Sequence, residues 1–163
     1  MLMRHTLLPA LAILLLAAGC GSDTESANDG GTPSFQQEGT LAFYQPSGDT
    51  LATIAIEIAD TDAERQRGLM QRRSLGYDRG MLFIFEETST DGMWMKNTPL
   101  PLDIVFVSPD SQVINIARRT TPFSEETIEP AAPRRFVVEV RAGFANEFGL
   151  TDSTRIRWVR TDN

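Results

Sequence analysis

Short apolar runs separated by turn-forming residues make up the chain from about residue 41 onward. Each run has close to the usual strand length of about 5–6 residues and is rich in Val, Ile, Leu or Phe, a pattern typical of β-strands. We predict strands at 41–45, 51–58, 81–86, 93–97, 102–107, 113–118, 136–141 and 155–160. Pro46-Ser47-Gly48-Asp49 supplies turn residues between the first two strands, which predicts a hairpin.

Two short helices are expected beside these strands. Thr61 and Glu64 have the spacing of a capping box, so we predict a helix from Thr61 through about Met70. A second helix is predicted over 142–148, followed by Gly149 in the position of a C-terminal cap. Short, regularly spaced strands with two minor helices predict a mainly β fold, a compact antiparallel β-sandwich or barrel.

The N-terminus has the pattern of an export signal. Residues 7–18 form an uncharged run that follows Arg4 and His5. A membrane-spanning helix needs roughly 20 apolar residues, whereas the core of a signal peptide needs roughly 7–15. Ala17-Ala18-Gly19-Cys20 then resembles the lipobox of bacterial lipoproteins, whose cysteine receives the lipid. The alternative is an ordinary secretory signal followed by a free thiol.

This reading divides the chain into three parts. Residues 1–19 are predicted to be a lipoprotein signal peptide, residues 20–39 the lipidated Cys20 with a flexible tether, and residues 40–163 the β domain. The tether is expected to be flexible because it is rich in Ser, Asp, Gly and Glu and has little to bury. We therefore expect the protein to be anchored to a membrane of the cell envelope, facing the periplasm or the exterior.

Composition excludes several kinds of chemistry. Without residues 1–19 the chain has fourteen basic and 22 acidic residues, a net charge of −8, and no histidine. A Ser-His-Asp triad, a Cys-His pair and a zinc site of the usual ligands are then impossible. The acidic balance also argues against nucleic-acid binding. We predict neither a bound metal nor a cofactor.

Three charged residues stand among apolar neighbours. Lys96 is the only lysine and lies two residues after Trp94, while Asp103 in 102–107 and Glu139 in 136–140 are each the one charge among apolar neighbours. Buried charges require partners. One interpretation is therefore a structural network of ion pairs and hydrogen bonds. The other is a ligand pocket in which Trp94 is the apolar wall. A general acid and base formed by Lys96 with Asp103 or Glu139 is a further hypothesis.

Other candidate motifs have simpler explanations. The Asp60-Asp62-Glu64 spacing is not a calcium loop, because Arg65 stands where such a loop requires glycine. The methionines are expected to fill the core rather than to bind copper; they are Met70, Met81, Met93 and Met95. Three arginine pairs would form an anion-binding patch only if the fold gathers them; they are 72–73, 118–119 and 134–135.

Several sequence blocks, taken in order, resemble the DUF192 family. They are Gly68-Leu69-Met70-Gln71-Arg72, Gly80-Met81-Leu82-Phe83, Trp94-Met95-Lys96-Asn97-Thr98, Leu102-Asp103-Ile104 and Glu139-Val140-Arg141-Ala142-Gly143. The resemblance covers about residues 51–158 and implies a compact β-sandwich, often exported, without an established biochemical activity. It singles out the polar and aromatic positions that match its motifs and assigns none of them a role; they are Arg72, Trp94, Lys96, Asn97, Asp103 and Glu139. We predict that these six residues form a polar pocket. The sequence departs from the family at Gln71, where an aromatic residue is common, and in the loop 120–133, which lacks a cysteine.

Together these observations predict a lipid-anchored binding or accessory module of the cell envelope. Its ligand is expected to be a small molecule, a glycan or a protein, and catalytic residues are not assigned. The alternative is an enzyme that acts on an envelope polymer or sugar through Lys96 with Asp103 or Glu139. A third possibility is a purely structural envelope protein in which these residues serve folding.

Overall fold

The computed structural model describes residues 33–161. The predicted signal peptide, Cys20 and most of the tether lie outside the described residues. Within the described part, no helix is long and apolar enough to cross a membrane. The elements are β1 (Gly39–Tyr44), β2 (Thr50–Ala59), α1 (Asp62–Arg67), β3 (Arg79–Ser89), β4 (Leu102–Val107), β5 (Val113–Ala117), β6 (Arg134–Arg141), α2 (Phe144–Glu147) and β7 (Arg155–Arg160).

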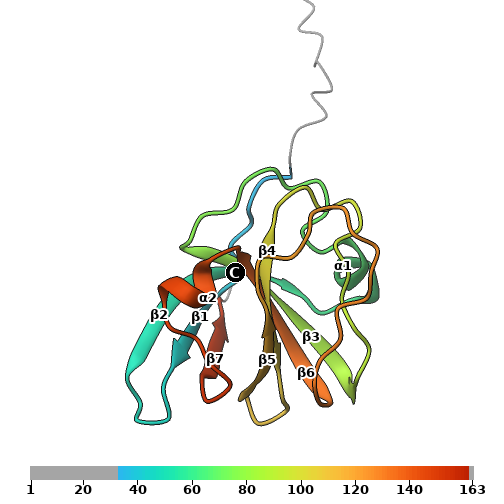
Figure 1. The fold of residues 1–163 in the computed structure, drawn as a ribbon. Coiled ribbons are helices and arrows are strands. Elements are labelled where there is room, and N and C mark those ends of the chain that lie inside the picture. The colour runs from blue at the N-terminus through green and yellow to red at the C-terminus, as the bar shows by residue number, and fades with distance from the viewer. Residues whose placement is uncertain (1–32, 162–163) are drawn as a thin grey trace, which may run out of the picture. The chain divides into compact units, whose positions relative to one another are not determined.

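The strands form one curled sheet in the order β5-β4-β6-β3-β2-β1-β7 (Figure 1). The predicted mainly β fold with two short helices is confirmed, as is the β1–β2 hairpin. All neighbouring strands are antiparallel except β2 and β3. A parallel pair needs a crossover connection, and α1 lies in the segment that provides it. A single bridge between Gln112 and Arg155 brings the two edges of the sheet together.

The prediction of a strand at 93–97 is wrong. Only Met93 makes a β-bridge, with Ile128, and the rest of the segment is an irregular loop. Asn97 has a φ of 54°, a left-handed conformation that is incompatible with an extended strand. The loop is held by backbone hydrogen bonds to residues 123–128, including that from Met95 N–H to the Ser124 carbonyl. The two helices are also shorter than predicted.

Side-chain alternation gives the sheet two apolar faces. In β4, Val105 and Val107 belong to one core cluster, which includes Phe144 of α2. We call this side the α2 face. Ile104 and Phe106 belong to a second cluster, which includes Leu69 and Met95. We call this side the α1 face, because Leu69 lies in the loop that leaves α1. Both faces are covered, so a charged residue in a central strand is buried whichever way it points.

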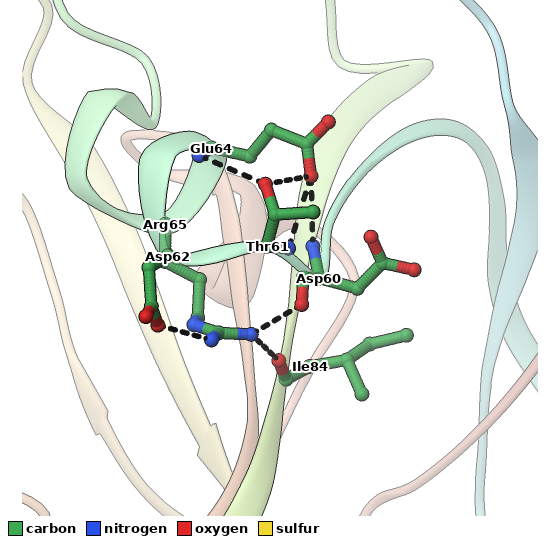
Figure 2. Close-up of polar contacts among 6 residues, drawn as sticks. All are labelled: Asp60, Thr61, Asp62, Glu64, Arg65 and Ile84. Carbon is green, nitrogen blue, oxygen red and sulfur yellow. Dashed lines mark hydrogen bonds and ion pairs between the residues drawn. The ribbon is translucent and has the colours of Figure 1, made fainter.

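Hydrogen bonds hold α1 in two ways, through a capping box at its N-terminus and through Arg65 (Figure 2). The Thr61 hydroxyl accepts from the Glu64 N–H, and the Glu64 carboxylate accepts from the Thr61 N–H and hydroxyl. These bonds lower the pKa of Glu64. Arg65 pairs with Asp62 and also donates to the Ile84 carbonyl in β3. A helix of six residues is too short to be stable alone, so these contacts hold it against the sheet.

Candidate functional site

A pocket of about 270 Å³ opens on the α1 face, between the end of α1, β3 and the loop around residue 94. Its walls are mostly apolar, with basic groups at several points. The lining residues are Arg65, Gln66, Arg67, Gly68, Leu69, Met70, Phe83, Phe85, Gly92, Met93, Trp94, Lys96, Thr98, Thr127 and Glu139. The volume is slightly below the range of about 300–1,000 Å³ that is usual for small-molecule sites, and seven of the fifteen lining residues are polar or charged.

Glu139 is the buried polar group of this pocket. Its side chain is only 4% exposed, and it lies in β6 opposite Met81 of β3. Burial raises the pKa of Glu139 to about 8, and no charged or hydrogen-bonding neighbour among the described residues offsets this effect. The carboxyl group is therefore mostly protonated at neutral pH. In that state it can donate one hydrogen bond and accept others.

Gly68 lets the chain pass close to this carboxyl group. A Cβ at position 68 would lie 3.0 Å from Cζ of Phe83 and 3.9 Å from Oε2 of Glu139. Gly68 also has a φ of 45°, which glycine tolerates far better than other residues. Glycine at this position therefore keeps the inner end of the pocket open beside Glu139.

Trp94 and Lys96 are exposed members of the pocket lining. Trp94 is 44% exposed, and Nζ of Lys96 lies 5.4 Å from the centroid of its ring. Nζ of Lys96 is also 3.5 Å from Oε2 of Glu125. Both partners of this ion pair are well exposed, so water weakens their attraction. The pocket thus has an exposed aromatic ring with a cation at its mouth and a neutral acid inside.

The structure does not gather the six candidate residues into one pocket. Trp94, Lys96 and Glu139 line the same pocket, whereas Asp103 points to the α2 face. The register explains this separation, because Asp103 lies opposite Val140 while Glu139 lies opposite Ile104. The two carboxylates are one position apart along the paired strands and therefore project from opposite sides of the sheet.

Asp103 is fully buried and its carboxylate is saturated by backbone groups. Oδ1 accepts from the Arg119 N–H at 2.8 Å. Oδ2 accepts from the N–H groups of Gly143 and Ala145, at 3.1 and 2.9 Å. These bonds tie the loop after β5 and the turn into α2 to the start of β4. Asp103 therefore has a structural role in this fold.

Arg72 and Asn97 also lie outside the lining of the pocket. Nη2 of Arg72 donates to both carboxylate oxygens of Glu57, at 2.6 and 2.7 Å, and both side chains are buried. Asn97 is exposed, and its carbonyl accepts from the Gln71 N–H. Gln71, where the sequence departs from the family pattern, is likewise exposed.

Glu57 was not among the residues predicted from the sequence, although a charge within an apolar run marks it in the same way as Glu139. Glu57 is the single charge in the run Ile54-Ala55-Ile56-Glu57-Ile58-Ala59, the same pattern that pointed to Glu139. In the sheet, Glu57 lies opposite Met81, which in turn lies opposite Glu139. The two glutamates thus share the α1 face, but only Glu57 has an arginine partner.

The described residues contain no cluster of three or more His, Cys, Asp or Glu side chains suited to a metal. Met95 is fully buried, and its sulfur accepts a hydrogen bond from the Thr120 hydroxyl at 3.1 Å. Met81 is also buried, whereas Met70 and Met93 are part of the pocket lining.

Comparison with known proteins identifies the family. Residues 43–158 match the DUF192 family model, described as an uncharacterized ACR, and the chain belongs to this family. No curated protein matches the sequence. A crystal structure from Sinorhizobium meliloti, provisionally described as a transcription regulator, is 34% identical with a TM-score of 0.72 and covers 77% of this chain and 98% of its own. A protein of unknown function from Novosphingobium aromaticivorans is 34% identical with a TM-score of 0.69, over 73% of this chain and 84% of its own.

Proposed function

We propose that this DUF192 protein is a lipid-anchored binding module of the cell envelope, and that its ligand is a small neutral molecule taken up beside Glu139. The observation that carries the proposal is a buried carboxyl group without a protein partner, facing an open pocket. A buried polar group normally has a hydrogen-bond partner. The Glu139 oxygens are not among the fully enclosed unpaired atoms of the described residues, so they open to the pocket, where a ligand would supply the partner.

The chemistry of the pocket defines the class of ligand. A protonated Glu139 would donate to a carbonyl or hydroxyl oxygen, and Phe83, Phe85 and Trp94 offer apolar surface to the rest of the ligand. N-acetylated sugars combine these properties, because they carry an amide carbonyl and have an apolar ring face. They also occur in envelope polymers, which agrees with the address expected from the sequence.

The address itself rests on the N-terminal sequence. The short apolar run ends at the only cysteine of the chain, Cys20, and an acidic and Ser-rich segment follows. A lipid at Cys20 would hold the β domain near a membrane, and the tether would allow it to reach its ligand. Cys20→Ser is expected to release the protein into the soluble fraction; retention of this variant in the membrane would contradict the anchor.

The alternative function is hydrolysis of an envelope sugar or polymer. The raised pKa of Glu139 suits a general acid at neutral pH, and Lys96 lines the same pocket. Asp103 cannot assist, because it lies on the α2 face. The description of the S. meliloti protein as a transcription regulator is not carried over, since a net charge of −7 disfavours binding to nucleic acid.

Fluorescence of Trp94 tests the proposal directly. Trp94 and Trp158 are the two tryptophans, so Trp158→Phe leaves Trp94 as the single reporter in the pocket. Titration with N,N′-diacetylchitobiose is expected to change the emission at pH 6, and to change it less above pH 8, where Glu139 loses its proton. The matched single-tryptophan variant, Trp94→Phe, should show little change.

A second variant tests whether the response depends on Glu139, and product release distinguishes binding from hydrolysis. Glu139→Leu in the Trp158→Phe background should abolish the response to the sugar. Absence of any response at pH 6, or an unchanged response with Glu139→Leu, would overturn the proposed ligand class. Release of free N-acetylglucosamine during the titration would favour the hydrolase alternative.

A further inference from the structure

A second cavity, lined by three arginines, lies near the turn that leads into α2. Its volume is about 440 Å³, and its lining residues are Arg73, Ser74, Leu75, Tyr77, Leu100, Pro101, Leu102, Arg119, Arg141 and Ala142. None of these residues is acidic. The protein as a whole has a net charge of −7, so an uncompensated cluster of positive charge is unusual in it.

The arginines come from three separate parts of the chain. Arg73 follows α1, Arg119 follows β5, and Arg141 ends β6. In the part of the chain that the structure describes, no carboxylate lies within ion-pair distance of any of them. Each side chain is exposed, and the three therefore face solvent around one concave surface.

The fold separates the functions of adjacent arginines. Arg72 is buried in its pair with Glu57, while the next residue, Arg73, lines the cavity. Arg118 donates to the side chain of Asn146 and to the Leu150 carbonyl, while Arg119 lines the cavity. In two of the arginine pairs, one member thus holds the structure and the other is left available to a ligand.

Tyr77 lies close to two of these arginines. Its hydroxyl donates to the Ala142 carbonyl at 3.3 Å, and its ring stacks on Phe144 with centroids 6.4 Å apart. The guanidinium carbon of Arg141 lies 4.9 Å from the centroid of the same ring. A Cβ at Gly143 would lie 3.1 Å from the Tyr77 hydroxyl and 3.5 Å from Nη2 of Arg119. Arg119 and Arg141 therefore converge on Tyr77.

Asp103 holds the backbone that presents these groups. Its carboxylate binds the N–H groups of Arg119, Gly143 and Ala145, so it joins the two loops that form this side of the cavity. Arg119 has a φ of 53°, an unusual conformation for a residue other than glycine. The hydrogen bond that the Arg119 N–H donates to the Asp103 carboxylate stabilises this conformation. Asp103 is fully buried, already accepts three hydrogen bonds and is not part of the cavity lining.

From this geometry we infer a second ligand site, which binds a phosphate group through Arg73, Arg119 and Arg141. The planar guanidinium group matches phosphate oxygens with paired hydrogen bonds, which a lysine cannot do. The cavity is larger than one phosphate, so the group would be part of an ester, either a soluble phosphomonoester or the headgroup of an anionic phospholipid. This site is separate from the Glu139 pocket and does not depend on its proposed function.

The test uses the full chain with Cys20→Ser as the wild-type background, so that the proposed lipid does not itself bind vesicles, and two double variants with the same loss of charge. Arg119→Gln/Arg141→Gln removes two arginines from the site, and Arg135→Gln/Arg157→Gln removes two exposed arginines from strands elsewhere. The probes are inorganic phosphate, glycerol 3-phosphate, and vesicles of phosphatidylglycerol or phosphatidylcholine. Titration calorimetry measures the soluble probes, and co-sedimentation measures the vesicles.

We expect the wild-type chain to bind glycerol 3-phosphate or phosphatidylglycerol vesicles in preference to phosphatidylcholine. The site variant should bind at least about tenfold more weakly, since two charge-assisted contacts are lost. The control variant and Glu139→Gln should bind as the wild type does. Preference for the soluble ester assigns a free phosphomonoester, and preference for the vesicles assigns a headgroup. Absence of phosphate binding in the wild type, or an equal loss in both double variants, would overturn the inference.

Discussion

Asp103 and Glu139 are almost neighbours in the sheet, and the sequence marks them in the same way. Each is the one charge among its apolar neighbours, and each lies opposite the residue next to the other in the β4–β6 pair. Asp103 faces α2 and receives three backbone hydrogen bonds. Glu139 faces the pocket, receives none from the described residues, and has a pKa raised to about 8.

The difference shows that burial of a carboxyl group does not by itself tell whether the group stabilises the fold or binds a ligand. Taking a carboxylate out of water is costly, and the protein can offset this with hydrogen bonds, with an opposite charge, or by retaining the proton. Asp103 uses the first, Glu57 with Arg72 the second, and Glu139 the third. Only the third leaves hydrogen-bonding capacity for a ligand.

The largest effect is expected from removing the Asp103 carboxylate. Asp103→Ala leaves the buried N–H groups of Gly143 and Ala145 and the part-buried N–H of Arg119 without an acceptor, at about 1–3 kcal/mol for each buried group. We expect the free energy of unfolding to fall by roughly 5 kcal/mol or more, measured by urea denaturation. Asp103→Asn retains one acceptor oxygen and should be less destabilised. A loss below about 1 kcal/mol with Asp103→Ala would contradict the structural role.

Glu139→Gln should have the opposite sign and depend on pH. The pKa of Glu139 is about 8 in the folded protein against an ordinary 4.5, so the folded state holds an extra proton between these values. The stability of the wild type therefore falls as pH rises from 4.5 to 8, whereas the neutral variant lacks this loss. By pH 9 the variant should be more stable by roughly 5 kcal/mol, and near pH 4 the two should be equal. Parallel pH profiles of thermal unfolding would refute this.

Breaking the Glu57–Arg72 pair should destabilise the protein by about 3 kcal/mol, because Arg72→Met leaves a buried carboxylate without its partner. The double variant Glu57→Leu/Arg72→Met should recover most of this loss, since neither charge then remains. A double-mutant cycle in guanidinium chloride measures the coupling. If the two single variants were additive, the contrast between paired Glu57 and unpaired Glu139 would lose its basis.

Lys96→Met is expected to have the smallest effect on stability. Its ion pair with Glu125 is exposed, and such pairs contribute less than about 1 kcal/mol. The melting temperature should therefore remain near that of the wild type, as judged by circular dichroism. Any loss of sugar binding in this variant would then reflect the pocket itself. Unfolding of the variant would instead indicate that Lys96 supports the fold.

Periodic patterns predicted the strands well and the site only in part. Alternation and turn residues located the strands, because they are set by burial within each strand. The prediction of a strand at 93–97 fails because a loop can also alternate exposed and buried residues. Here Met95 is buried in the core and anchors the loop, while Trp94 beside it is exposed. The register of β4 against β6 depends on tertiary packing. The sequence therefore could not separate Asp103 from Glu139, nor pair Arg72 with Glu57.

The central claim is that Glu139 is a buried acid without a protein partner, and its protonation can be observed directly. A carbon-13 NMR titration of the side-chain carboxyl groups in the full chain would give the pKa of Glu139, with Glu139→Gln for assignment. The account predicts a midpoint of about 8, with that of Glu64 below the ordinary glutamate value of 4.5. A midpoint for Glu139 near 4.5 would contradict it.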